Sequence, residues 1–208
     1  MEMDRRTFVT AGLLLAAGSA VIGPQPAAAA QAPHKVVSLP KPELTGGAPL
    51  FACLAQRRTN RHISDKELPL DVMGALFWAA VGVNRESGKR TIPTAMNKQE
   101  IVVYAARGDG VWKYLPDDHS MSLVMEGDER GRFGTAGCVL LYCVPIVDRF
   151  NGMHAGSAYQ NVGLYCAQAG LANVVKFQKH DALSKDLTMP QGWDICITQH
   201  VGYPAKMK

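Results

Sequence analysis

The sequence of 208 residues predicts an α+β fold with a mostly antiparallel central sheet flanked by helices. Helical patterns come first along the chain, a hairpin follows them, and strand, helix and strand patterns close it. A hydrophobic content of 47% supports a packed core, and no internal repeat is visible. We expect one α+β domain over residues 48–208, preceded by an arm at 31–47 and by a separate segment at 1–30.

Residues 1–30 have the pattern of an export signal. The basic stretch "RRTF" at 5–8 is followed by an uncharged apolar run at 9–23 and then by small residues. The arginine pair favours the twin-arginine route, with cleavage near Ala30 or Ala32. A membrane anchor is the alternative, but the apolar run is shorter than the roughly 20 residues that a spanning helix needs. We therefore expect a periplasmic or otherwise extracytoplasmic protein, exported folded and without a stable membrane anchor after cleavage.

Two helices are expected ahead of the first hairpin. Residues 48–58, "APLFACLAQRR", form a short helix with Pro49 near its first turn. Residues 70–84 form a longer helix that ends near Gly82, and a loop covers 85–99. The apolar residues that share one face of the longer helix are Met73, Leu76, Phe77 and Ala80.

The second half of the chain supplies the strands. A hairpin is predicted at 101–106 and 111–115, because the turn signal "RGDG" separates two apolar runs. Residues 116–135 are charged and are expected to form a loop with one helical turn around 122–125. The continuous apolar run at 137–147 predicts a strand buried on both faces. A long helix rich in small residues is expected at 154–175, and the last strand at 193–204.

Composition excludes several classes of function. The net charge of +4 is mild and no Lys/Arg block is present, so no nucleic-acid partner is expected. Five widely spaced cysteines in apolar contexts indicate buried hydrophobic side chains, not a disulfide framework. Six scattered histidines show no ligand spacing, so no metal site is expected. The motifs of nucleophile elbows, P-loops and dinucleotide-binding loops are missing from the sequence.

A basic cluster offers the strongest chemical signal. Arg57, Arg58, Thr59 and Arg61 lie close together in the sequence. Guanidinium groups and a hydroxyl provide the permanent charge and the donors that a phosphate monoester needs. The alternative is a solvated basic patch on the surface.

Three further stretches favour the phosphate interpretation. In "PTAMN", a rigid proline turn at Pro93 is followed by a hydroxyl and by the amide of Asn97. Gln160 and Asn161 interrupt an otherwise apolar helix. That helix ends in small residues at 170–172, where a planar ring could approach the backbone.

These motifs, in this order, resemble the nitroreductase superfamily, and in particular its SagB/thiazoline-oxidase-type branch. The pattern there is Arg-Arg-Ser-x-Arg, a helix ending near Trp-Ala-x-x-Gly-x-Asn-Arg, Pro-Ser-x-x-Asn, and a strand ending in Val-Tyr. Here the corresponding stretches are "RRTNR", "WAAVGVNR", "PTAMN" and "IVVY", and "QNVGLYCAQAGL" and the closing "GYP" also match. The resemblance spans about residues 48–204. Departures are Thr59 and Thr94 in place of serines, and Ala172 in place of a glycine.

The resemblance implies an intertwined homodimer that binds FMN at the subunit interface. The flavin phosphate would be held by the arginine cluster, with Lys206 adding charge. The Pro-Ser-x-x-Asn position would line the flavin from the partner subunit, and the segment after the long helix would approach the reactive face of the ring. The implied cofactor-binding residues are Arg57, Arg58, Thr59, Arg61, Thr94, Ala95, Met96, Asn97, Gly170, Leu171 and Lys206.

The function implied is that of an FMN-dependent oxidoreductase. It would pass electrons or hydride in a ping-pong cycle to a small organic acceptor such as a nitro compound or a quinone, with the chemistry on the flavin and no catalytic triad. His119 and His154 are candidate proton donors, with a structural or solvated role as the alternative. Two other functions stay open: a non-catalytic exported flavin-binding protein, and an exported interaction protein without the cofactor.

Overall fold

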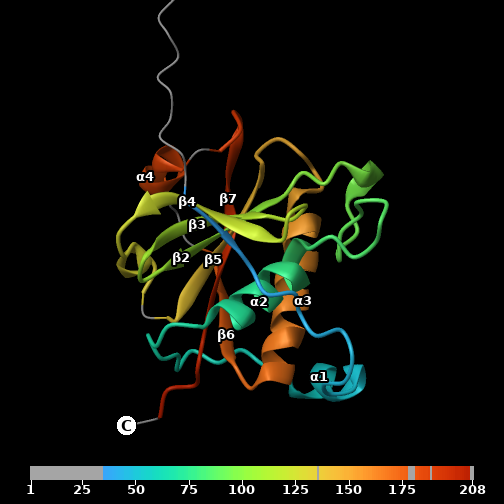
Figure 1. The fold of residues 1–208 in the computed structure, drawn as a ribbon. Coiled ribbons are helices and arrows are strands. Elements are labelled where there is room, and N and C mark those ends of the chain that lie inside the picture. Colours follow the sequence, from blue (N-terminus) through green and yellow to red (C-terminus); the bar gives the residue numbers. More distant parts are fainter. Residues whose placement is uncertain (1–34, 135, 178–180, 188, 207–208) are drawn as a thin grey trace, which may run out of the picture. The chain divides into compact units, whose positions relative to one another are not determined.

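A seven-stranded antiparallel sheet forms the centre of the computed structural model (Figure 1), which describes residues 35–134, 136–177, 181–187 and 189–206. The export signal expected at 1–30 lies outside the described residues. The strands follow the order β1-β4-β3-β2-β5-β7-β6. They are β1 (Val36–Ser38), β2 (Val102–Arg107), β3 (Gly110–Leu115), β4 (Ser120–Glu126), β5 (Cys138–Pro145), β6 (Ala172–Lys176) and β7 (Trp193–Gly202). The predicted α+β class and antiparallel sheet are confirmed.

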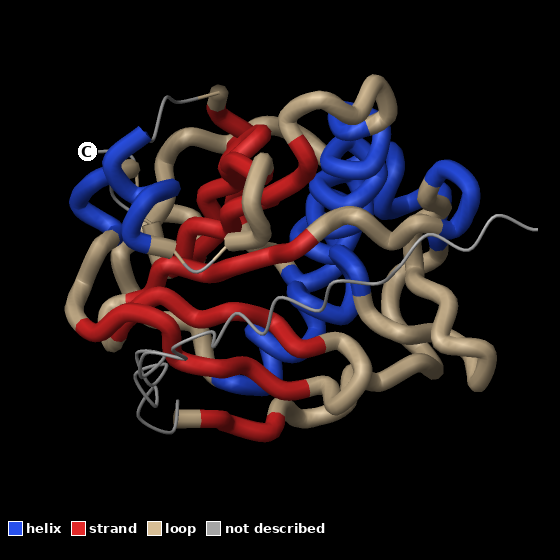
Figure 2. The backbone as a smooth tube through the Cα atoms, turned by 90° about the horizontal axis from the view of Figure 1, so that it is seen from above, coloured by secondary structure: helices blue, strands red, loops and turns tan. Residues whose placement is uncertain are grey.

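The helices divide between the two faces of the sheet. α2 (Leu70–Val81) and α3 (Asn151–Ala169) pack on one face, and α1 (Leu50–Gln56) follows the arm and contacts α3 (Figure 2). The opposite face is covered by the 3₁₀ turn η2 (Arg130–Arg132) with the residues after it, and by α4 (Asp181–Asp186). A second 3₁₀ turn, η1 (Ala95–Asn97), lies in the loop after α2. No helix among the described residues is long and apolar enough to cross a membrane.

The position of β5 in the sheet explains why its sequence is apolar without interruption. Successive side chains of a strand point to opposite faces of the sheet. Leu140 and Tyr142 pack in the core beneath α2 and α3, whereas Val139 and Leu141 pack in the core on the other face. All four are fully buried. The predicted strand with two buried faces is therefore confirmed.

α2 begins after Pro69 and ends at Gly82, close to the predicted bounds. Its four predicted core residues are all fully buried. Asn161 on α3 donates its Nδ2–H to the carbonyl of Ala79 at 3.1 Å, which joins the two helices. One of the two polar interruptions of α3 is thus a structural contact, whereas the other, Gln160, is exposed.

Two local predictions are wrong. Residues 120–126 form strand β4, not a loop with a helical turn at 122–125, because pairing with β3 on one side and β1 on the other satisfies their backbone groups. The long helix covers Asn151–Ala169 and does not continue to 175, because Gly170 adopts a left-handed conformation (φ 66°) that ends it. Residues 172–176 then form β6, an edge strand of the sheet.

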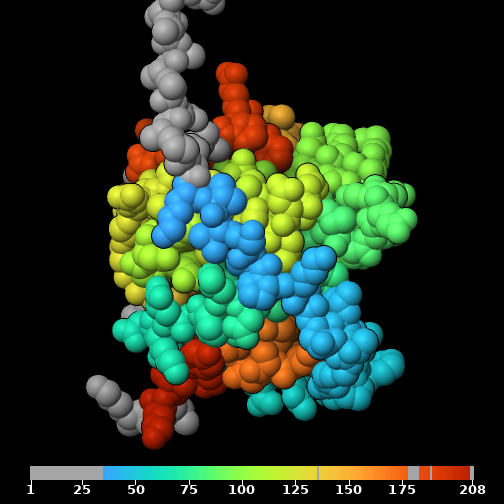
Figure 3. Space-filling model, viewed as in Figure 1, coloured from blue at the N-terminus to red at the C-terminus, as the bar shows by residue number. Residues whose placement is uncertain are grey.

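The described part of the arm packs against the rest of the fold. β1 pairs with β4, and the chain then runs over the surface to α1 (Figure 3). Leu39 is buried, and its N–H donates to the carbonyl of His119 at 3.0 Å. A Cβ on Gly74 of α2 would lie 2.6 Å from the carbonyl oxygen of Pro40, so the arm crosses α2 where only a glycine leaves room.

Candidate functional site

The predicted arginine cluster follows directly on α1. Arg57 is the C-cap of this helix, and its N–H donates to the carbonyl of Cys53 at 2.8 Å. The chain then extends, and the N–H of Asn60 donates to the carbonyl of Asn173 at 2.8 Å. This bond joins the cluster to the beginning of β6.

The arginines of this cluster carry charge that no carboxylate neutralises within the described part of the chain. Arg57 is half-buried beside α3, where a Cβ on Gly163 would lie 3.5 Å from its Cδ, and Arg58 and Arg61 are exposed. The Nε–H of Arg58 donates to a backbone carbonyl. By contrast, four arginines elsewhere in the fold form ion pairs with an Asp or Glu. They are Arg90, Arg107, Arg130 and Arg132. An uncompensated cluster of this kind is suited to an anion.

The C-terminal residues lie beside this cluster. Ile63 and Pro204 form an antiparallel bridge, and the N–H of Ala205 donates to the carbonyl of His62 at 2.9 Å. This pairing brings Lys206 next to the segment that carries Arg61. A further positive charge, distant in sequence, thus lies near Arg61, although neither Arg61 nor Lys206 lines the cavity beside Arg57 and Arg58.

A cavity of about 200 Å³ opens between the arginine cluster and the end of α3. Gly170 lies at its edge, and a Cβ there would meet no heavy atom within 4 Å. Leu171 is buried and its N–H donates to the carbonyl of Cys166. The cavity therefore combines the guanidinium donors of Arg57 and Arg58 with an exposed backbone at Gly170. Its lining residues are Gln56, Arg57, Arg58, Asn60, Cys166, Ala167, Gly170, Leu171 and Asn173.

The residues at 94–97 lie at the other end of α3. The N–H of Ala95 donates to Nε2 of His154, in the first turn of the helix, at 2.9 Å. Thr94 is half-buried and accepts from the N–H of Gln99, whereas Met96 and Asn97 are exposed. From His154 to Gly170 the helix runs for about 24 Å at roughly 1.5 Å per residue. One chain therefore does not bring the predicted flavin-lining loop to the arginine cluster.

The chain is similar to known nitroreductases. Residues 54–142, which include the arginine cluster and the 94–97 loop, match the model of the nitroreductase family. A candidate nitroreductase from Ralstonia eutropha JMP134 has a TM-score of 0.77 and 29% identity, with 83% of this chain and 90% of that one covered. The protein has a nitroreductase-like fold.

Two more relatives extend the comparison. A candidate nitroreductase from Methanocaldococcus jannaschii is 26% identical over 147 residues, which are 58% of this chain and 74% of the relative. A nitroreductase with bound FMN from Bacteroides fragilis shares the fold at a TM-score of 0.54 and 16% identity, covering 77% of this chain and 94% of that one.

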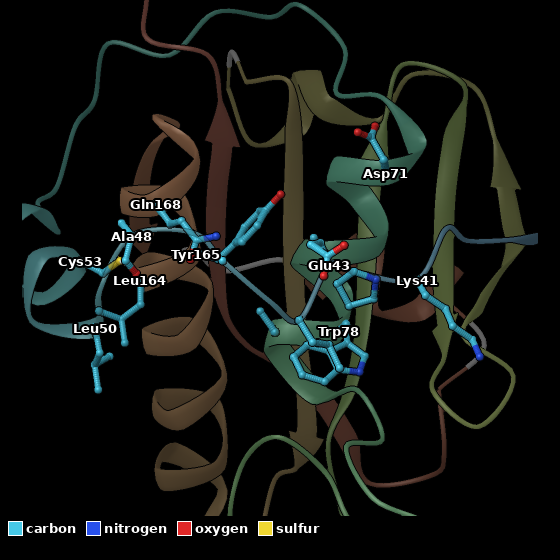
Figure 4. Close-up of a pocket in the computed structure, with 15 residues that line it drawn as sticks. Lys41, Glu43, Ala48, Leu50, Cys53, Asp71, Trp78, Leu164, Tyr165 and Gln168 are labelled. Carbon is cyan, nitrogen blue, oxygen red and sulfur yellow. The ribbon is translucent and has the colours of Figure 1, made fainter.

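A wider cavity of about 690 Å³ lies between the arm, α1, α2 and α3 of this nitroreductase-like fold (Figure 4). Trp78 and Tyr165 contribute aromatic walls, Glu43 and Asp71 contribute two carboxylates, and Lys41 contributes one ammonium group. Acidic groups disfavour a phosphate through like-charge repulsion. The smaller cavity beside the arginines is therefore the better anion site.

Both candidate proton donors have partners within the chain. Nδ1 of His119 accepts from the hydroxyl of Tyr114 at 2.8 Å, and its Nε2–H donates to the carbonyl of Pro40 at 2.9 Å. His154 is buried and accepts from Ala95. Burial raises the pKa of Tyr114, so this hydroxyl keeps its proton as the donor to His119. His119 therefore holds the arm through Pro40, which fits a structural role and not the role of a proton donor.

The substitution at Ala172 does not narrow the cavity beside the arginines. Ala172 packs in the core on the face of the sheet opposite α2 and α3, and it pairs with Gly202 across β7. The methyl group therefore points away from Gly170 and Leu171.

Sequence reasoning missed Asn60, Asn173 and Gln199. Gln199 is fully buried: its Oε1 accepts from the hydroxyl of Tyr142 at 2.6 Å, and its Nε2–H donates to Oδ1 of Asn173 at 3.0 Å. This network fixes the strand residue whose carbonyl accepts from Asn60. The only signal in the sequence was a polar amide inside each of two apolar strands.

Proposed function

We propose that this protein is an FMN-dependent oxidoreductase of the nitroreductase type. The family match and the FMN-bound relative from Bacteroides fragilis support an oxidoreductase role. The observation that carries the choice of cofactor is the uncompensated arginine cluster beside an open backbone at Gly170. A single compact cluster suits one phosphate monoester, as in FMN, and not the pyrophosphate of FAD.

Different residues beside the cavity would bind the phosphate and the ring of FMN. Arg57, Arg58 and Arg61 would neutralise the phosphate, with the hydroxyl of Thr59 as a further donor and Lys206 as a further charge. Gly170 leaves the backbone accessible, so a planar ring would pack against it beside the buried Leu171. When bound, FMN supplies the redox chemistry. The protein's own contribution is to orient the ring and to limit the access of water.

The separation of about 24 Å along α3 supports a homodimer with a shared site. In an isologous dimer with the two α3 helices antiparallel, the 94–97 loop of one subunit approaches the arginine cluster of the other. Exposed apolar side chains lie at both ends of this helix: Leu50, Phe51 and Leu54 near one end, and Met96 and Met153 near the other. A partner subunit that covers these side chains would bury apolar surface at both ends of α3.

The reaction we propose is a ping-pong transfer of electrons or hydride from a donor to a small organic acceptor such as a nitro compound or a quinone. We also propose the SagB/thiazoline-oxidase-type branch and export by the twin-arginine route, both from the sequence. Changing Arg5 and Arg6 to lysine should stop export and leave FMN binding intact. Fractionation of cells, with flavin content measured in each fraction, tests both halves of this expectation.

The decisive experiment identifies the flavin and then tests turnover. The mature chain is purified from cells supplied with riboflavin, the flavin is released by heat, and it is identified by chromatography. FMN is the expected product, and recovery of FAD or of no flavin contradicts the cofactor assignment. Holoprotein that binds FMN but reduces no acceptor in the presence of several classes of donor would support the non-catalytic flavin-binding alternative.

A further inference from the structure

The loop that contains η1 has an unusual backbone. Met96, Asn97 and Gln99 have φ angles of 52°, 54° and 55°. Positive φ is uncommon for residues other than glycine, and such strain persists only where the surroundings hold it. Three such residues within four positions indicate that this loop is held in one conformation by specific contacts.

Most of these contacts are local. The N–H of Gln99 donates to Oγ1 of Thr94 at 3.1 Å, and its side chain bonds to Arg90 and to the carbonyl of Gly88. Among the described residues, the hydrogen bond from the loop to α3 is that from the Ala95 N–H to Nε2 of His154, at 2.9 Å. This bond fixes the loop to the helix that passes through the fold.

The bond defines the ionisation state of His154. A backbone N–H can only donate, so Nε2 must carry a lone pair and the imidazole must be neutral. The proton of the ring is then on Nδ1, which is buried and has no hydrogen-bond partner within the described structure. The side chain is only 1% exposed. An imidazolium would place an Nε2–H against the N–H of Ala95, and the bond would be lost.

Charged groups lie near His154. Asp148, in the turn before α3, interacts electrostatically with it, and a backbone hydrogen bond from Phe150 lowers the pKa of Asp148, so this carboxylate stays charged. Lys98 lies 3.8 Å from Asp148 and 3.3 Å from Glu100. Neutral His154 thus has Ala95 as a partner, and charged His154 has Asp148 as a nearby counter-ion. These two alternatives give the loop a means of responding to pH.

We propose that His154 is a pH-dependent positioning residue for the 94–99 loop: the neutral ring holds the loop, and protonation releases it. Imidazole is the side chain that ionises between about pH 5 and 8, a range found outside the cytoplasm. The release itself does not depend on the proposed function. Its consequence does, because the loop lines the flavin only if the shared FMN site is correct. FMN affinity should then fall as the pH decreases.

Hydrogen–deuterium exchange of the mature protein tests the release without reference to activity. Protection of peptides covering 93–100 is measured from pH 5 to 8 and corrected for intrinsic exchange, with the buried strand β2 as the internal control. Wild-type protection of the loop should fall about five- to tenfold toward pH 5, the equivalent of one hydrogen bond. His154→Gln, whose amide oxygen accepts without ionising, should remove the pH dependence. His154→Leu should leave the loop poorly protected at every pH.

Loop protection in wild-type protein that does not change with pH, or an equal pH dependence in His154→Gln, overturns the proposal. FMN titrations in the same buffers distinguish a failure of the role proposed for His154 from a failure of the proposed FMN site. A loop that responds to pH while FMN affinity stays constant supports the role of His154 and contradicts the assignment of the loop to the flavin site. FMN binding together with an unresponsive loop contradicts the role of His154 alone.

Discussion

The N–H of Asn60 donates to the carbonyl of Asn173 at 2.8 Å, so the arginine cluster is fixed to the strand that follows Gly170. The two sides of the candidate phosphate site are therefore joined by backbone. Side chains of Asn173, Gln199 and Tyr142 support this junction from within the core.

Arg57→Ala should weaken FMN binding by about ten- to a hundredfold, because one charge-assisted contact contributes roughly 1.5–3 kcal/mol. Isothermal titration of the apoprotein with FMN measures the change. Arg132→Ala is the matched control, since Arg132 contacts Glu129 and Asp186 on the other side of the sheet. Equal affinities of the Arg57 variant and the wild-type protein would mean that the cluster is a surface patch.

A mixture of two damaged variants should recover FMN binding if the site is shared. Arg57→Ala and Asn97→Gly each damage both sites of a homodimer, but a heterodimer contains one intact site; glycine tolerates the positive φ at position 97. After random subunit exchange, about one quarter of all sites should bind FMN with wild-type affinity. Absence of any recovery, with exchange verified by mass spectrometry, contradicts a site formed by two subunits.

Gly202→Ala should destabilise the fold by about 1–3 kcal/mol. A Cβ at this position would lie 2.7 Å from Cγ2 of Ile63 and 2.8 Å from the carbonyl of Ser64, so the pairing that brings Lys206 to the cluster must move. Urea denaturation gives the free energy of unfolding. Gly131→Ala is the control, because a Cβ there meets nothing within 4 Å, and a comparable loss in both variants would contradict the packing argument.

Stability should decrease as the pH rises above about 8.5. Burial raises the pKa of Cys138 to about 12, and burial also raises the pKa values of Cys143 and Cys166. Thiols of the unfolded chain ionise from roughly pH 8.5, whereas the buried thiols of the folded protein stay protonated. Each buried thiol therefore lowers the free energy of unfolding by up to about 1.4 kcal/mol per pH unit in this range. Denaturation at pH 8 and pH 10 checks this, and Cys138→Ala should reduce the slope. A flat profile would contradict the burial of these thiols.

Reduced nicotinamide should be a poor reductant if the protein works outside the cytoplasm. The sequence has no dinucleotide-binding motif, and the expected export removes it from the NADH and NADPH pools. We expect a quinol, a small redox protein or the substrate itself to reduce the flavin. Anaerobic stopped-flow measurement of flavin absorbance compares the donors. Saturable reduction by micromolar NADH at about 10 per second, a typical enzymatic rate, would contradict this expectation.

Local patterns in the sequence determined much of this protein. The apolar run of β5, the turn between β2 and β3, and the 3.6-residue periodicity of α2 each act between near neighbours, so each could be predicted. The arginine cluster could be recognised because its four residues lie within one short segment. Burial of most cysteines followed from their apolar contexts, and Cys53, Cys138, Cys143 and Cys166 are buried.

Contacts between distant segments were decided only by the tertiary structure. β4 has a sequence that suits a loop or a strand, and its pairing with both β3 and β1 made it a strand. Asn173 lines the cavity because β6 lies beside the arginine segment, and Lys206 lies near Arg61 because the C-terminus pairs with residues 62–64. The sequence placed the 94–97 loop and the arginine cluster in one site; the length of α3 separates them within one chain. Register and distance of this kind arise from long-range pairing, which local periodicity does not encode.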